Sequence, residues 1–345
     1  MMKRENSSKF RGTGVAIVTP FKDSGAIDFE SYSNLVDHVI NGGVEFIVAL
    51  GTTGEASTLS KQEKKALIEF TVEKINRRVP LVVGISGNDT SELVLSIHAT
   101  PLKGVDAILS VCPYYNKPQQ EGLYQHFKLV AEASPLPVIL YTVPGRTASN
   151  LSPSTTLRLA KDFDNIIGIK EASGNFDQIG KVLSERPEGF LVLSGDDGLT
   201  LPQIALGCDG VISVVANIYP GLFSEMVRHS LRGDFVKARE IHYRLSEFIN
   251  SLFADGSPAG IKAALSISDL SYASLISGKR APILSSFLPI SGLGIRLIWS
   301  VMIIISPIWN IGFTPPAAFE RNKYLIPRYF ITRMGKAICS VVYPS

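Results

Sequence analysis

The residue best suited to covalent chemistry is Lys170, which closes the apolar run Ile166–Ile169. A lysine at the end of a buried strand points either into the interior of the fold or into solvent. In the interior, desolvation disfavours the ammonium form, lowers the pKa and yields a neutral amine that can attack a carbonyl. Taken alone, Lys170 is more often a strand-end lysine whose amine stays in water, because lysine is rarely buried without a partner.

Four hydroxyl-bearing residues, Thr52, Thr53, Tyr115 and Tyr141, lie at the ends of other apolar runs. An amine that forms an imine needs groups that carry protons to and from the carbinolamine and the enamine. Taken singly, each hydroxyl more often satisfies a backbone group in a turn or in the core. Taken with Lys170, they predict a proton relay around a Schiff-base lysine that uses neither a metal nor a cofactor.

Eight short apolar runs, each followed by a helical pattern, must position these residues. Their continuous apolar character predicts strands buried on both faces, as in a parallel sheet covered by helices. The runs are Gly14–Pro20, Glu45–Gly51, Pro80–Ser86, Ala107–Cys112, Pro137–Tyr141, Ile166–Lys170, Phe190–Ser194 and Gly210–Val215. Polar residues at their carboxyl ends are candidates for catalysis, because barrel enzymes place their active sites there.

Helix-start signals lie between the runs. Asp28 is a candidate N-cap, Ser60 and Glu63 match a capping box, and Ser152 is followed by proline at the first helical position. Eight strand–helix units in about 230 residues predict an α/β fold, a (β/α)8 TIM barrel followed by C-terminal helices. A doubly wound sheet is the alternative. It usually has fewer strands and needs a Gly-rich phosphate-binding loop after the first strand, which Val18–Lys22 is not.

The composition of the 345 residues is that of a globular protein, with 45% apolar and 19% charged residues. The net charge of +3 is too small to indicate a nucleic-acid partner, and we expect none. This charge is unevenly distributed. Residues 271–345 hold eight Lys or Arg and one acid, which gives +7 and leaves −4 for residues 1–270.

Cysteine content and the first residues bear on the compartment. The three cysteines, Cys112, Cys208 and Cys339, are too few and too scattered for a disulfide framework or a zinc cluster. The segment Met1–Lys9 lacks the apolar stretch of a signal peptide. We therefore expect a cytoplasmic protein.

Changes of pattern divide the chain into four segments. They are an N-terminal extension (1–9), a (β/α)8 catalytic barrel (10–219), a C-terminal helical region (220–270) and an atypical apolar and basic tail (271–345). Within the tail, the 23 residues Leu297–Phe319 carry no charge and are long enough to cross a bilayer, although Pro307, Pro315 and Pro316 disfavour a continuous helix. We interpret the tail as an aberrant segment, a reading-frame accident or a replacement foreign to this fold. Membrane contact through the tail and a packed tail are the alternatives.

Six blocks at the expected strand ends resemble the dihydrodipicolinate synthase family, whose members are now called 4-hydroxy-tetrahydrodipicolinate synthases. In chain order they are Gly51–Glu55, Pro113–Asn116, Tyr141–Arg146, Ile167–Ala172, Ser194–Asp197 and Gly210–Ser213. The resemblance extends over roughly Phe10–Leu270. Six blocks in the family order are a far more specific signal than any single motif.

The resemblance implies a pyruvate-dependent class I aldolase, a lyase. Its reaction would be the condensation of pyruvate with L-aspartate 4-semialdehyde to 4-hydroxy-tetrahydrodipicolinate, the first committed step of lysine and diaminopimelate biosynthesis. Lys170 would form the imine with pyruvate, whose carboxylate Thr52 and Thr53 would hold.

Further roles follow from the same resemblance. Tyr141, Thr53 and Tyr115 would form the proton relay, with Tyr115 reaching in from a neighbouring subunit of a homo-oligomer, a tetramer or a dimer. Arg146 would bind the carboxylate of aspartate semialdehyde, a task suited to the bidentate guanidinium. Gly195 and Ile212 would line the pocket through their backbone.

Two alternatives to this function stay open. A sugar-acid aldolase such as N-acetylneuraminate lyase resembles the chain around Lys170, but usually has serine at the position of Thr52 and lacks the arginine that is Arg146 here. A catalytically silent barrel that serves as a binding or membrane-attached protein is the other. Trapping of a pyruvate imine with borohydride separates both aldolases from the silent barrel, and a substrate panel separates the two aldolases.

We predict weak or absent feedback inhibition by lysine. Lysine-inhibited family members bind it between subunits near the positions that match Ala56, Lys61, Lys64, Asn88, Glu92 and Tyr114. Strongly inhibited members tend to carry other side chains, such as histidine, at Lys61 and Lys64. Each added cation opposes a cationic ligand by on the order of 1 kcal/mol, even in water. Initial rates measured against lysine concentration test this, and inhibition at micromolar lysine would contradict the electrostatic argument.

Overall fold

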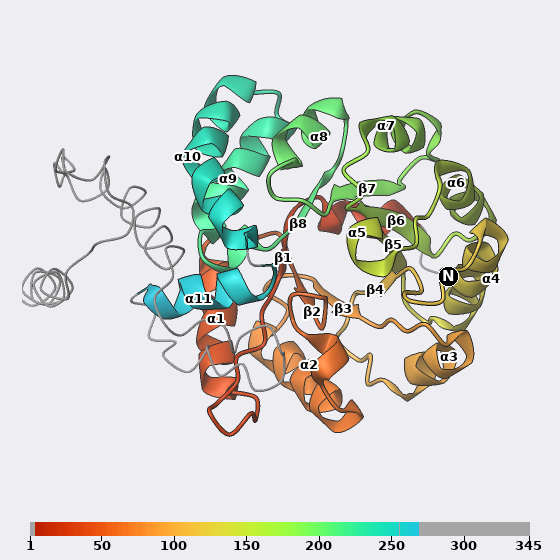
Figure 1. Ribbon diagram of the computed structural model, residues 1–345, viewed down its shortest axis with the longest axis horizontal. Coiled ribbons are helices and arrows are strands. Elements are labelled where there is room, and N and C mark those ends of the chain that lie inside the picture. Colours follow the sequence, from red (N-terminus) through yellow and green to blue (C-terminus); the bar gives the residue numbers. More distant parts are fainter. Residues whose placement is uncertain (1–3, 255, 269–345) are drawn as a thin grey trace, which may run out of the picture. The chain divides into compact units, whose positions relative to one another are not determined.

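The computed structural model describes residues 4–254 and 256–268 (Figure 1). The predicted tail (271–345) lies outside the described residues, as do residues 1–3 of the N-terminal extension and 269–270 of the helical region. Within the described part, eight parallel strands form a closed barrel with helices around it, which confirms the (β/α)8 barrel predicted from the sequence. In the same residues, no helix combines the length and apolar character needed to cross a membrane.

Each of the eight predicted runs overlaps one strand of the barrel. The strands are β1 (Gly12–Ala16), β2 (Phe46–Ala49), β3 (Leu81–Gly84), β4 (Ala107–Val111), β5 (Val138–Thr142), β6 (Ile166–Glu171), β7 (Leu191–Ser194) and β8 (Gly210–Ser213). Neighbours along the chain pair in parallel, and β1 also pairs with β8, which closes the ring. All eight carboxyl ends therefore open on the same side of the barrel.

Helices follow the strands and cover the outside of the barrel. They are η1 (Arg4–Phe10), α1 (Phe29–Asn41), η2 (Ala56–Thr58), α2 (Lys61–Ile75), α3 (Thr90–Ala99), α4 (Gln120–Ala133), α5 (Pro144–Thr147), α6 (Pro153–Asp162), α7 (Phe176–Glu185), α8 (Thr200–Leu206), η3 (Val215–Asn217), α9 (Pro220–Leu231), α10 (Phe235–Phe253) and α11 (Ala259–Ile267). The predicted caps are confirmed: Asp28 accepts from Ser31 N, and Ser60 with Glu63 forms a complete capping box. Helix α9 packs on β1, β8 and α1, while α10 and α11 pack in turn beyond it.

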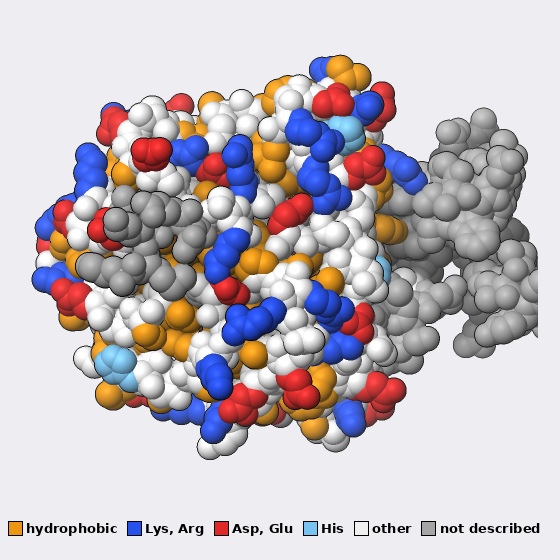
Figure 2. Space-filling model, turned by 180° about the vertical axis from the view of Figure 1, so that it is seen from behind, with side chains coloured by type: hydrophobic (Ala, Val, Ile, Leu, Met, Phe, Trp, Pro, Cys, Tyr) orange, Lys and Arg blue, Asp and Glu red, His pale blue; other side chains and the backbone are white. Residues whose placement is uncertain are grey.

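Apolar side chains fill the inside of the barrel. They include Phe46, Val48, Ile139, Leu193 and Ile212, all at most 1% exposed. Phe10 from η1 completes this cluster, and its ring meets that of Phe46 edge to face at 5.6 Å. Seen from behind, lysine and arginine side chains lie among acidic and apolar ones, so this face presents charge of both signs (Figure 2).

One histidine is buried between two of the outer helices. His126 of α4 is 3% exposed, and its Nδ1 shares a 2.8 Å hydrogen bond with Thr90 Oγ1 at the start of α3. Its Nε2 is buried without a hydrogen-bond partner among the described residues. Burial lowers the pKa of His126 to about 4, because the imidazolium would lose its hydration there.

His126 should make the stability of the fold depend on pH. The unfolded chain binds a proton near pH 6.5 and the folded chain only near pH 4, so stability falls as pH decreases through that interval, by on the order of 3 kcal/mol in all. Urea unfolding at pH 7.5, 6 and 5 should show a shallower loss for His126→Gln than for the unchanged protein. The exposed His98 on α3 supplies the control, His98→Gln. Equal pH dependence in all three proteins would contradict the prediction.

Candidate active site

Lys170 and Tyr141 lie side by side inside the barrel. They are register partners in the parallel pairing of β5 and β6, and each is 6% exposed. Lys170 Nζ lies 4.4 Å from the centroid of the Tyr141 ring, within the range of a cation–π contact. Among the described residues, no carboxylate forms an ion pair with Lys170. The side chain is thus inside the barrel rather than in water, which decides between the two orientations that the sequence allows.

Small residues leave space around the Lys170 side chain. A Cβ placed on Gly195, which follows β7, would lie 3.1 Å from Lys170 Cε and 2.6 Å from Ala172 Cβ. On β8, Ile212 is 1% exposed and belongs to the same interior cluster as Tyr141. The predicted residues Lys170, Tyr141, Gly195 and Ile212 therefore share the interior of one barrel.

The turn after β2 holds both predicted threonines. Thr53 is buried, whereas Thr52 is exposed. Left-handed residues stand at both ends of this turn, Leu50 with φ of 55° and Glu55 with φ of 55°. Gly84 of β3 makes the first of them possible, because a Cβ there would approach Leu50 O to 2.1 Å. Each left-handed non-glycine residue costs of order 1–3 kcal/mol, so surrounding contacts must hold the turn.

Arg146 lies on the short helix α5, which follows β5. Its side chain is exposed, and Nη2 donates a 3.3 Å hydrogen bond to Ser257 O ahead of α11. The guanidinium is therefore tied to the C-terminal helices through one nitrogen. Within residues 4–254 and 256–268, its other donors have no hydrogen-bond partner and could bind a ligand.

A cavity of about 700 Å³ opens beside these residues. One part of its wall is formed by Thr52, Tyr141 and Arg146, and another by lysines of α2, Lys61 and Lys64. Lys170 and Thr53 do not line the cavity themselves; each is beside a residue that does. A ligand in the mouth of the barrel would thus reach Lys170 past Tyr141.

Lys61 and Lys64, the two residues on which the prediction of weak lysine inhibition rests, line this same cavity. Lys61 forms an ion pair with Glu92 of α3, which occupies the carboxylate that an incoming amino acid would use. Burial, followed by the charge of Lys61, lowers the pKa of Lys64. The engaged carboxylate of Glu92 is consistent with a weak lysine site, whereas the lowered pKa of Lys64 reduces the charge that would repel lysine; the inhibition itself stays a prediction.

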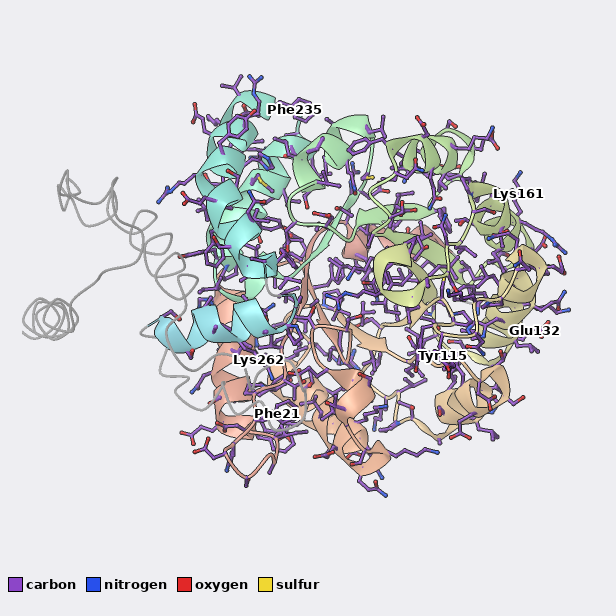
Figure 3. The ribbon with its side chains drawn as sticks, viewed as in Figure 1. Phe21, Tyr115, Glu132, Lys161, Phe235 and Lys262 are labelled. Atoms are coloured by element: carbon purple, nitrogen blue, oxygen red, sulfur yellow. The ribbon has the colours of Figure 1, made fainter. Side chains whose placement is uncertain are left out.

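Tyr115 is the one predicted site residue that the structure places apart from the others. It lies on the loop after β4 with φ of 74°, and 89% of its surface is exposed (Figure 3). Its neighbour Tyr114 is 40% exposed and lines the cavity. Within one chain, Tyr115 does not join Tyr141 and Thr53.

A polar network behind β5 and β6, buried except at Asn150, was not predicted from the sequence. Glu171 accepts from Gln178 Nε2 at 2.7 Å, and Gln178 Oε1 accepts from Asn150 Nδ2 at 2.8 Å. Asn150 Oδ1 in turn accepts from Thr142 Oγ1 at 3.1 Å. Thr142 and Glu171 follow Tyr141 and Lys170 directly and are register partners, so the network ties the two strands together from outside. Burial raises the pKa of Glu171.

The donors for a metal site are not gathered in the described part of the chain. No group of three or more His, Cys, Asp or Glu side chains is placed to hold a metal ion there. The chemistry of the assembled residues is instead that of an amine, hydroxyls and a guanidinium. Such a set can bind carboxylates and form an imine with a carbonyl compound.

Comparison with known proteins shows the same relationship over most of the chain. The Dihydrodipicolinate synthetase family matches residues 9–286, so the family pattern continues past residue 271, further than the six blocks indicate. A 4-hydroxy-tetrahydrodipicolinate synthase from Flavobacterium psychrophilum is 53% identical over 253 residues, 73% of this chain and 86% of that protein. The enzyme of the same name from Phocaeicola vulgatus is 48% identical over 263 residues, 76% of this chain and 89% of that protein.

Solved structures agree with the sequence relatives. The chloride-inhibited dihydrodipicolinate synthase from Acinetobacter baumannii, in complex with pyruvate, is similar with a TM-score of 0.79 and 39% identity, covering 85% of this chain and 98% of that one. The order of the six blocks, the closed barrel and these matches point to one relationship. The chain belongs to the dihydrodipicolinate synthetase family.

Proposed function

We propose that this protein is a lyase that condenses pyruvate with L-aspartate 4-semialdehyde to 4-hydroxy-tetrahydrodipicolinate, with Lys170 as the Schiff-base lysine. The reaction begins lysine and diaminopimelate biosynthesis. The observation that carries the assignment is the buried Lys170 amine against the ring of Tyr141, in a chain of this family. The Acinetobacter baumannii relative was solved with pyruvate, which supports pyruvate as the first substrate.

The covalent steps start with the Lys170 amine in its neutral form. Nζ attacks the carbonyl carbon of pyruvate, and loss of water from the carbinolamine gives the imine. Loss of a methyl proton then gives an enamine, whose carbon forms the new C–C bond with the aldehyde carbon of the semialdehyde. The amino group of the second substrate attacks the imine carbon, which closes the ring and releases Lys170.

Each of these steps moves a proton, and the hydroxyl of Tyr141 is the candidate carrier beside Lys170. Backbone pairing of β5 and β6 places Tyr141 beside Lys170, and its ring centroid lies 4.4 Å from Lys170 Nζ. Thr53 is buried in the neighbouring turn and would pass the proton on. A positioned acid or base of this kind contributes typically 10²- to 10⁴-fold to a rate.

Two different groups would hold the two substrate carboxylates. The turn at Thr52 and Thr53 offers hydroxyl and backbone donors to the carboxylate of pyruvate. Arg146, which lines the cavity, would hold the carboxylate of the semialdehyde through its guanidinium. Arg146 also favours this reaction over that of the sugar-acid aldolases, which lack an arginine at this position.

Tyr115 would complete the relay of a neighbouring subunit. Its 89% exposure and left-handed backbone describe a side chain presented outward on a shaped loop, as a residue lent to another chain would be. Leu95 on α3 is 62% exposed and Tyr114 is 40% exposed, which adds apolar surface for such a contact. We therefore propose a homo-oligomer, at least a dimer, as the functional unit.

Replacement of Lys170 tests the covalent assignment. Borohydride reduction in the presence of pyruvate should add a reduced pyruvyl mass to the peptide that contains Lys170, and Lys170→Ala should show no adduct by mass spectrometry. Arg146→Ala is the matched comparison: it should keep the adduct but lose most of its catalytic efficiency with the semialdehyde. An undiminished adduct in Lys170→Ala would refute the assignment, and loss of the adduct in Arg146→Ala would refute the division of roles.

Gly195→Ala should slow imine formation. The added methyl group would crowd Lys170 Cε and Ala172 Cβ and displace the amine. A displacement on the order of 1 Å can cost about 100-fold, so we expect the rate of borohydride trapping to fall by roughly 10- to 100-fold. Gly180→Ala on α7 is the control, because a Cβ there meets nothing closer than 4.0 Å. An unchanged trapping rate in Gly195→Ala would show that the Lys170 side chain tolerates the contact.

A further inference from the structure

A buried ion pair joins α11 to the turn that holds the threonines. Glu55, the last residue of that turn, pairs with Lys262 of α11, and the residues are 6% and 1% exposed. Lys262 Nζ also lies 4.3 Å from the centroid of the Phe21 ring, on the loop after β1. Figure 3 labels Lys262 and Phe21 on the α11 side of the barrel. The pair thus connects three segments that are far apart in the chain.

Burial makes each member of the pair dependent on the other. Desolvation lowers the pKa of Lys262, while the charge of Glu55 acts in the opposite direction. A buried pair of this kind adds little net stability compared with apolar side chains of the same size, but removing one member leaves an uncompensated charge. A gain in stability is therefore a weak explanation for the Glu55–Lys262 pair. A role in fixing the local backbone geometry explains it better.

The geometry that the pair fixes is that of the turn after β2. Glu55 has left-handed φ and ψ of 55° and 35°, and its N–H donates to Thr52 O at 3.1 Å. The preceding carbonyl, Gly54 O, accepts from Thr19 Oγ1 at 2.7 Å. Thr53 lies between these anchored points. The orientation of Thr52 and Thr53 thus depends on where the Glu55 side chain is held.

We infer that Glu55 and Lys262 are positioning residues, which hold the Thr52–Thr53 turn in the conformation that binds the pyruvate carboxylate. Helix α11 then serves the active site through this one contact, without touching the substrate. The inference rests on the proposed function, because it assigns the threonines to pyruvate. The inference gives the Glu55–Lys262 pair a role in binding pyruvate, whereas Arg146 is proposed to bind the semialdehyde.

The alternative is a purely structural role, in which the pair only anchors α11 to the barrel. The two possibilities differ in what happens when both charges are removed. Glu55→Leu with Lys262→Met replaces the pair by apolar side chains, a change that is often neutral for stability. If the pair is only an anchor, this double variant should recover the thermal stability and the Michaelis constant for pyruvate together. If it positions the turn, stability returns and pyruvate binding does not.

The experiment compares Glu55→Gln, Lys262→Met and the apolar double variant with the unchanged protein. We expect the KM for pyruvate to rise at least tenfold in all three, with the KM for aspartate semialdehyde within about threefold of normal. Tm should fall in the single variants and recover in the double variant. Borohydride should still trap pyruvate on Lys170 when pyruvate is saturating. Glu55→Gln is nearly isosteric, so it keeps the test decisive if Lys262→Met folds poorly.

A second, partly buried pair supplies the control. Arg186 and Asp209 form an ion pair ahead of β7 and β8, at the opposite end of the strands from the threonine turn. Arg186→Met, which leaves Asp209 without its ion-pair partner, should lower Tm and leave the KM for pyruvate unchanged. The inference fails if the KM for pyruvate follows Tm across all variants, or if it stays normal in Glu55→Gln. Failure of the unchanged protein to form any pyruvate adduct would instead overturn the proposed function.

Discussion

The position of one amine inside an apolar barrel is the constraint from which the rest of the site follows. Lys170 Nζ lies against the face of the Tyr141 ring inside the barrel, and among the described residues no carboxylate forms an ion pair with it. An amine in this position can attack a carbonyl compound that enters the barrel. The interior must also leave space for a ligand, which explains why Gly195 lies so close to Lys170.

The parallel barrel brings these residues together through the pairing of adjacent strands. Adjacent parallel strands place residues in fixed register, so Lys170 and Tyr141 meet once β5 and β6 pair. The polar network from Glu171 to Thr142 then fixes the same two strands on their outer faces. Reactive groups point inward and the network points outward, as the alternation of side chains along a strand requires. The rigid part of the site is therefore the sheet, and the loops supply specificity.

Much of this could be predicted from the sequence, because the signals were local. The apolar runs located all eight strands, and the cap at Asp28 and the capping box at Ser60 appear as predicted. Residues at strand ends could be expected at one mouth, since topology alone brings them there. The Glu55–Lys262 pair could not be found this way. A glutamate in a turn and a lysine in an apolar helix, about 200 residues apart, are ordinary until the fold brings them together.

The C-terminal helices bear on the site more directly than their position in the chain suggests. Among their contacts, Ser257 O accepts from Arg146 Nη2, and Lys262 pairs with Glu55. The first contact reaches Arg146, which is proposed to hold the carboxylate of the semialdehyde. The second reaches Glu55, which is proposed to orient the threonines that hold the carboxylate of pyruvate. Segment 257–262 thus braces both binding groups, although it contributes no side chain to the chemistry. A barrel whose strands set the reactive amine still needs these later residues to fix the loops that present substrate to it.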